Sequence, residues 1–351
     1  MRAEFGTAYE LMQRLMQAAQ DAADPALLLM AHFALGGMLR YWRDGLVPAR
    51  WHLEQSLALY DPAQHGTLAA RYGLYPQVSS LANLATLLWQ LGYPEQARQR
   101  SHEAVTLAHA AGSPFDVTVA LAYDALLLQM CHALPQAQAQ SEAVIALATQ
   151  HGFAHWVHSC GVLRGWGLAL QGQAGEGIGH IRQGLEHLSA MGVHLMRPYV
   201  LGLLAQVYQW AGQADAGLAT LAEARRLIQV TEESVLMAPL AILQGDLLHM
   251  QAGPAATVPQ VEACWRQALA VARHHQTKAW EQRAALRLSQ RWHRQGQCTQ
   301  ARQLLAPLYG WFTEGFDTPD LQEARAVLYA LACHSGQRLS PPHPGRASAA
   351  T

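Results

Sequence analysis

Three histidines and a cysteine stand at spacings that could bind a metal ion. His151, His155 and His158 lie at positions i, i+4 and i+7, and Cys160 follows closely. On one continuous helix the imidazoles would share a face, and imidazole and thiolate are ligands that zinc prefers. However, Gly152 favours a helix end after His151, and no carboxylate stands nearby to orient the imidazoles. We therefore expect no metal site and no cofactor.

No catalytic motif is recognisable in the sequence. The phosphate-binding pattern Gly-x-x-x-x-Gly-Lys-Ser/Thr is absent, and Lys278, the only lysine, is followed by Ala279. A Cys–His or Ser–His–Asp site needs polar groups that converge from loops, and the expected loops are short and carry Gly, Pro and Gln. We therefore expect that the chain is not an enzyme. The remaining histidines considered are expected on solvated helix faces: His180, His187, His274 and His275.

The composition excludes several classes of protein. The 351 residues are 51% hydrophobic and 14% charged, which is too apolar for a disordered chain. The net charge of −1 is too balanced for a nucleic-acid binder. No apolar stretch has the roughly 18 residues of a membrane span, and Met1 to Phe5 lacks the apolar core of a signal peptide. The five cysteines form no close pairs, which favours reduced thiols and a cytoplasmic location.

The spacing of apolar residues predicts helices wherever it is inspected. Ala, Leu, Gln and Arg dominate, whereas β-branched residues are scarce, which favours helix over strand. One amphipathic segment ends at Gly212 and a second follows it, so the pair predicts an antiparallel helix hairpin. The apolar positions of the first segment, with the period of a helix, are Val200, Leu201, Leu204, Val207, Tyr208 and Ala211.

The hairpin recurs about every 40 residues, which is typical of a helical solenoid. Small residues stand where two helices would cross, for example Gly165 and Gly177, as in tetratricopeptide units. We predict an all-α, tetratricopeptide-like right-handed α-solenoid of about seven to eight antiparallel helix hairpins, from about Glu4 to about Cys333. Prolines mark expected helix starts at Pro25, Pro94, Pro114, Pro135, Pro198 and Pro259.

The two ends of the sequence differ from the repeats. Thr7 to Ala19 is typical of the second helix of a repeat whose first helix is missing, and its apolar face (Leu11, Leu15, Ala18) would lack one neighbour. Either this helix caps the stack, or the chain was separated from a larger protein. We expect one repeat domain over residues 1–335 and a disordered, proline-rich tail over residues 336–351.

Aromatic and polar residues recur where first helices should face a concave groove. Tryptophans alternating with Arg and Gln suit the binding of an extended peptide or a small aromatic ligand. The alternative is that the indoles fill the core between repeats. We expect core positions for Trp156, Trp265 and Trp280, and leave both interpretations open for the groove tryptophans. The predicted groove residues are Trp42, Arg43, Thr86, Trp89, Trp166, Gln206, Trp210, Arg283, Gln290 and Arg294.

The segment from Tyr309 to Thr318, YGWFTEGFDT, closely resembles the C-terminal end of a family of large bacterial signalling proteins. Those proteins join a class III adenylate/guanylate cyclase domain, an AAA-type ATPase domain and a tetratricopeptide region. The resemblance covers only the family's C-terminal third, and Tyr75 stands where the family usually carries Asp before Pro76. Further matching segments are Ala49 to His65, Gly92-Tyr93-Pro94, Ser101 to Ala104, Leu163 to Trp166, Arg197-Pro198-Tyr199 and Leu304-Leu305.

The resemblance implies a regulatory arm without the cyclase and ATPase domains, or a split or truncated copy. We therefore predict a non-catalytic helical-repeat module that binds a protein or peptide partner, for example a cyclase/ATPase protein, or a small-molecule effector. No nucleic-acid or membrane partner is expected. The alternative is the small-molecule-sensing solenoid of a transcriptional regulator. A pocket inside the superhelix would favour the sensor, whereas an open aromatic groove would favour peptide or protein binding.

Overall fold

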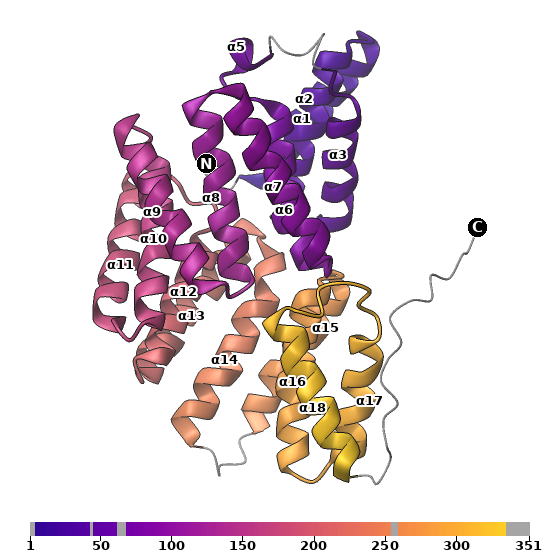
Figure 1. The fold of residues 1–351 in the computed structure, drawn as a ribbon, viewed down its shortest axis with the longest axis vertical. Helices are drawn as coiled ribbons and strands as arrows, with labels where there is room; N and C mark the ends of the chain where they lie inside the picture. The colour runs from indigo at the N-terminus through magenta and orange to yellow at the C-terminus, as the bar shows by residue number, and fades with distance from the viewer. Residues whose placement is uncertain (1–3, 43–44, 62–67, 254–258, 335–351) are drawn as a thin grey trace, which may run out of the picture.

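The computed structural model describes residues 4–42, 45–61, 68–253 and 259–334. These residues form α-helices joined by short turns, with one 3-10 turn (η1, Ser234–Leu236) and no strand within the described ranges. Figure 1 shows the helices arranged side by side in a winding stack. The predicted tail over residues 336–351 lies outside the described residues, as does Arg43.

Seven antiparallel hairpins can be traced in the described part of the chain, which confirms the predicted repeat. The single helices α1 (Phe5–Asp21) and α18 (Pro319–His334) pack against the first and last hairpins, and the short α5 (Leu68–Tyr72) precedes the second. The hairpins are α2 (Pro25–Leu39) with α3 (Leu46–Ala58), α6 (Pro76–Leu91) with α7 (Pro94–Ala111), α8 (Pro114–Met130) with α9 (Leu134–Gln150), α10 (Ala154–Leu170) with α11 (Ala174–Ala190), α12 (Arg197–Trp210) with α13 (Ala214–Thr231), α14 (Met237–Ala252) with α15 (Pro259–His274), and α16 (Lys278–Arg294) with α17 (Cys298–Tyr309).

Local sequence accounts for the helix boundaries. Proline occupies the first helical position at Pro25, Pro94 and Pro114, where its missing N–H costs no hydrogen bond. Helix α6 ends at Gly92, whose φ of +95° is accessible to glycine at little cost. Tyr75, before α6, has its backbone N–H bound at 2.8 Å by Oδ1 of Asp116 from the next hairpin.

Small residues set how closely the paired helices approach. A Cβ atom on Gly177 would lie 2.4 Å from the carbonyl oxygen of Gly165, and one on Gly165 would lie 2.8 Å from that of Gly177. Helices α10 and α11 therefore cross at a distance that only glycine allows at this point. This contact confirms the prediction of small residues at the helix crossing.

The first helices of successive hairpins lie next to one another along the inner side of the stack. Consecutive first helices contact one another in the order α2, α6, α8, α10, α12, α14 and α16. The last of them, α16, contacts the single helix α18. The stack also turns far enough for α16 to contact α6, which belongs to the second hairpin (Figure 1). The inner faces of helices distant in sequence therefore lie close together.

The opening helix α1 leaves part of the face of Leu11, Leu15 and Ala18 exposed and packs another face on the core. Phe5 and Ala19 of α1 are buried, and Met12 packs against the same core, whereas Leu11 is 57% exposed. The described residues contain no helix long and apolar enough to cross a membrane.

Candidate functional site

Two of the predicted groove residues are buried near the N-terminal end of the stack. Trp42 donates its indole N–H to Oε2 of Glu232 at 2.6 Å. Thr86 is fully buried, and its hydroxyl accepts a hydrogen bond of 2.9 Å from Nη1 of Arg40. Neither side chain offers a surface to a ligand: the groove prediction is wrong for Thr86, and Trp42 takes the core position that was left open for the groove tryptophans.

Trp89 and Arg283 join the second hairpin to the last one. Trp89 is 4% exposed, and its ring packs edge-on against Trp280, with 5.2 Å between the ring centroids. The guanidinium of Arg283 lies 4.9 Å from each of these two rings and forms an ion pair of 2.8 Å with Asp320. It also donates a hydrogen bond of 2.7 Å to the carbonyl of Met130. This cluster closes the superhelix, and Trp89 occupies a core position, one of the two interpretations left open for it.

Asp320 carries the negative charge of this cluster in a largely buried position. Burial disfavours the ionised carboxyl, but the neighbouring Arg283, through its charge and its hydrogen bond, keeps the pKa of Asp320 below its ordinary value. The two charges are therefore held as an ion pair that links α16 to α18. Arg283 is engaged within the chain and does not face a free groove.

Trp166 and Trp210 belong to the core of the middle hairpins. Trp166 is 1% exposed, and its indole N–H donates to Oε1 of Gln206 at 2.7 Å. The rings of Trp166 and Trp210 lie 5.7 Å apart, and Trp210 is half-buried against the core. Of the two interpretations left open for Trp166, the structure favours the core, whereas Gln206 and Trp210 keep partly exposed surfaces.

The remaining groove candidates lie towards the C-terminal end. Gln290 donates a hydrogen bond of 2.7 Å to Glu323. Arg294 is exposed at the end of α16. Of the three tryptophans expected in the core, Trp265 is fully buried, and Trp280 and Trp156 are half-buried against core clusters; Trp156 also lines a cavity.

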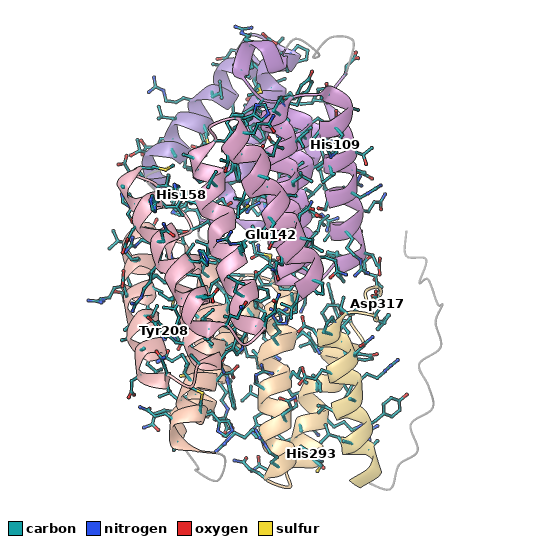
Figure 2. The ribbon with its side chains drawn as sticks, turned by 60° about the vertical axis from the view of Figure 1, so that its left-hand side comes forward. His109, Glu142, His158, Tyr208, His293 and Asp317 are labelled. Carbon is teal, nitrogen blue, oxygen red and sulfur yellow. The ribbon has the colours of Figure 1, made fainter. Side chains whose placement is uncertain are left out.

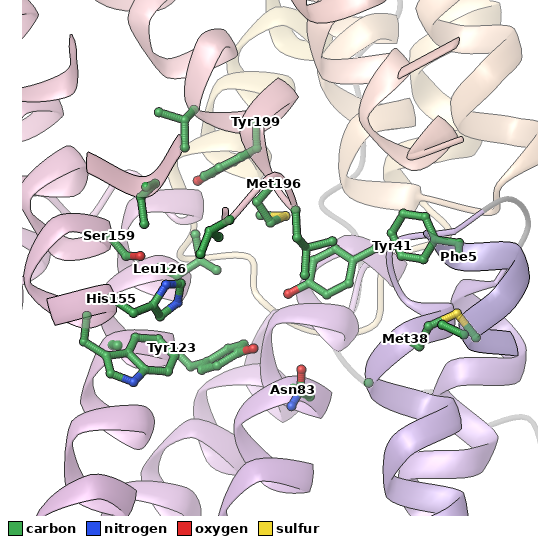
Figure 3. A pocket seen from close by; sticks show the side chains of 18 of the residues that line it. Phe5, Met38, Tyr41, Asn83, Tyr123, Leu126, His155, Ser159, Met196 and Tyr199 are labelled. Carbon is green, nitrogen blue, oxygen red and sulfur yellow. The ribbon is translucent and has the colours of Figure 1, made fainter. Parts of the chain in front are cut away.

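The cavity that Trp156 lines was not anticipated from the sequence. It has a volume of about 680 Å³ and lies between α1, α2, α6, α8, α10 and α12 and the segment joining α11 to α12. Figure 3 shows side chains from these segments pointing into it. Aromatic and aliphatic groups make up most of its wall, including Phe5, Leu11, Phe33, Met38, Leu126 and Met196.

A few polar groups interrupt this apolar wall. His155 and Ser159 come from α10, and Tyr199 comes from α12 (Figure 3). The Nδ1 atom of His155 is buried and has no hydrogen-bond partner in the chain as described. Burial lowers the pKa of His155 below its ordinary value, so the imidazole is neutral near pH 7. The hydroxyl of Tyr199 donates to Oε1 of Gln129.

A buried cation lies behind one part of the wall. Arg40 is 3% exposed, and its guanidinium lies 4.3 Å from the ring centre of Tyr41 and 5.2 Å from that of Tyr123. Both tyrosines line the cavity, together with Asn83, whose Oδ1 accepts a hydrogen bond of 2.8 Å from Arg40. The rings therefore separate this charge from the cavity.

The structure separates the histidines that were considered as zinc ligands: His151 ends α9, whereas His155 and His158 lie on α10. His151 caps the end of α9, and Gly152 follows with a φ of +73°, so the helix breaks where expected. His158 stacks on His187 with 4.1 Å between ring centroids. In the described ranges, no three His, Cys, Asp or Glu side chains are grouped to hold a metal ion.

The comparisons with known proteins show the fold. The apo form of RapI matches with a TM-score of 0.52 and 11% identity over 83% of this chain and 98% of that chain. The chain is a tetratricopeptide-like α-solenoid. Yeast Tom70 matches with a TM-score of 0.46 and 11% identity over 95% of this chain and 60% of that chain. No family model and no curated protein matches the sequence.

Proposed function

We propose that this chain is a non-catalytic helical-repeat module that binds an effector in its inner cavity. The observation that carries the proposal is the cavity of about 680 Å³, which lies within the size range of small-molecule sites. Its wall is mostly apolar and contains a few convergent polar groups, as such sites do. Two of these polar groups, His155 and Ser159, lie one turn apart on α10 and line the cavity together.

The position of the tryptophans supports a small effector over an extended peptide. An open groove would present the rings of Trp89 and Trp166 to a ligand, but both pack within the chain. The cavity instead brings together side chains that lie far apart in the sequence, such as Phe5 and Tyr199. Its walls are therefore suited to a compact molecule.

We further propose that the module acts as a regulatory arm, or a split or truncated copy of one, in a cyclase/ATPase signalling system. Its protein partner would then be a cyclase/ATPase protein. This proposal rests on the sequence resemblance; two of the segments that carry it contact each other in the fold, with 5.6 Å between the ring centroids of Tyr93 and Trp311. The alternative is the sensing solenoid of a transcriptional regulator, which the same cavity would serve. A neighbouring reading frame for a cyclase or an ATPase would distinguish the two.

Effector binding is tested by filling the cavity with a side chain. A Cβ atom on Gly37, in α2, would meet nothing within 4 Å, and Gly37 lines the cavity. Gly37→Phe should therefore occupy the cavity without a clash, and it replaces a helical glycine by a better helix former. The matched control is Gly179→Phe, because Gly179 is also helical and open but exposed on α11.

The readout is the fluorescence of the uncharged, polarity-sensitive dye Nile red. Wild type and Gly179→Phe should bind one dye molecule per chain with a blue-shifted emission, whereas Gly37→Phe should bind at least about tenfold more weakly. Circular dichroism should show equal helix content in all three proteins. Equal dye binding by the two variants would place the dye elsewhere and contradict the proposal.

A further inference from the structure

The cavity has an apolar end formed by the N-terminal helices. Phe5 and Met12 of α1 and Met38 of α2 line this end. Figure 3 shows Phe5 and Met38 on the opposite side of the cavity from His155 and Ser159. An apolar group placed against these side chains would leave water, and burial of apolar surface is favourable by about 25 cal/mol per Å².

The opposite end offers hydrogen bonds. The imidazole of His155 and the hydroxyl-bearing side chain of Ser159 lie one turn apart on α10, and both line the cavity. A neutral imidazole nitrogen either donates or accepts, depending on the tautomer, and a hydroxyl does both. A ligand that supplies a hydroxyl or amide replaces the hydrogen bonds that these groups make to water, whereas a hydrocarbon leaves them unpaired, so the polar ligand is favoured.

The wall contains almost no charge. Among the described residues, Glu4 is the only Asp, Glu, Lys or Arg side chain that lines the cavity, and it is exposed at the start of α1. The nearest buried cation, Arg40, is engaged by Asn83 and Thr86 and lies against the ring faces of Tyr41 and Tyr123. A charged ligand would therefore lose its hydration without gaining an ion pair.

From these three features we infer that the cavity selects an uncharged amphiphile. Its apolar body lies against Phe5, Met12 and Met38, and its single hydrogen-bonding end lies at His155 and Ser159. The inference rests on the proposed function, since it names the class of effector that the same cavity takes. His155 and Ser159 are then the residues that distinguish a hydroxyl- or amide-bearing ligand from a hydrocarbon of the same shape.

Three probes of one shape test this assignment by displacing Nile red from the full chain at pH 7.5. Naphthalene is apolar, 2-naphthol is uncharged with one hydroxyl, and 2-naphthoate is anionic. We expect 2-naphthol to displace the dye at about a three- to tenfold lower concentration than naphthalene, as one added hydrogen bond would give. We expect 2-naphthoate to be at least about tenfold weaker than 2-naphthol.

A pair of histidine variants on α10 locates the polar end. His155→Leu should remove the advantage of 2-naphthol over naphthalene and leave naphthalene within about twofold of wild type. The matched control is His158→Leu, because His158 lies on the same helix but stacks on His187 and does not line the cavity. It should leave the order of all three probes unchanged.

The outcomes separate this inference from the proposed function. Displacement by 2-naphthoate as efficient as by 2-naphthol, or an unchanged preference in His155→Leu, would overturn the ligand class and the polar end while the cavity remained a binding site. If the Gly37→Phe variant binds the dye as wild type does, the proposed function itself is contradicted.

Discussion

Oε1 of Glu314 accepts a hydrogen bond of 2.9 Å from the backbone N–H of Glu95, although the two residues are 219 positions apart. The same oxygen accepts the N–H of Gln96 at 3.1 Å. The residue before α7, Tyr93, provides no side-chain cap of its own. Glu314 therefore caps the start of α7 from the far end of the chain. Figure 2 labels Asp317, which follows in the same segment and pairs with Arg98.

Removing this long-range cap should weaken the closure of the superhelix. Glu314→Ala leaves the first N–H groups of α7 without their acceptor, and we expect the free energy of unfolding to fall by about 1 kcal/mol. Urea denaturation followed by circular dichroism measures the change. Glu142→Ala is the control, because Glu142 is exposed and bonds only to Gln138 one turn away. A loss as large in the control would mean that Glu314 contributes no capping energy.

The ion pair between Arg283 and Asp320 predicts strong coupling between two substitutions. Arg283→Met should cost about 3 to 5 kcal/mol, because it leaves the carboxylate of Asp320 buried without its partner. The double variant Arg283→Met/Asp320→Leu should recover most of that loss, since it buries no unpaired charge. Thermal and urea unfolding of the four proteins in this cycle give the coupling energy. If the losses in the free energy of unfolding are additive, the two side chains have no coupling energy and the prediction is contradicted.

The buried carboxyl of Glu233 should make the free energy of unfolding fall as the pH rises. Burial raises the pKa of Glu233 from 4.5 to about 7, although the N–H of Met196 favours its charged form. Between these two values the folded chain keeps a proton that the unfolded chain releases. This contribution to the free energy of unfolding is therefore complete below pH 4.5 and is lost as the pH rises through 7.

Glu233→Gln removes this titration and keeps an oxygen that can accept the N–H of Met196. The variant should match wild type near pH 4 and be more stable at pH 8, by about 3 kcal/mol at most. Urea midpoints measured across this range test the prediction. A variant that loses stability equally at both pH values would show that the carboxyl does not titrate in this window.

For Trp210 both a ligand-binding and a core role were left open, and its contacts in the structure predict the result expected of a core residue. Trp210→Ala removes a half-buried ring that packs on Trp166, so we expect a loss of about 2 to 3 kcal/mol in stability. Binding of Nile red by the folded protein should be unchanged, because Trp210 does not line the cavity. Trp156→Ala serves as the comparison, since Trp156 does line it and should weaken dye binding.

The purified chain should hydrolyse neither ATP nor GTP and form no cyclic nucleotide. The sequence lacks a phosphate-binding loop, and nucleotide chemistry depends on such groups to position and neutralise the phosphates. Phosphate release and cyclic nucleotide formation are measured over a range of protein concentrations. Turnover that survives repurification and scales with the protein would contradict this expectation.

The sequence by itself determined the helices, their ends and the repeat. Pro94 and Gly92 act within one turn of chain, and the apolar period of Val200 to Ala211 depends only on local geometry. The inner placement of the first helices also followed from the repeat. These features are local, so each can be read from neighbouring residues.

Only the tertiary structure decided which distant helices meet. The curvature of a solenoid accumulates from small rotations at each repeat, so the contact of Glu314 with α7 depends on the sum of all of them. The same sum brings α1 near α10 and places His155 in a cavity wall rather than in a metal site. It also buries Trp89 against Trp280, because the side that periodicity assigned to a groove is covered by a helix nearly 200 residues later.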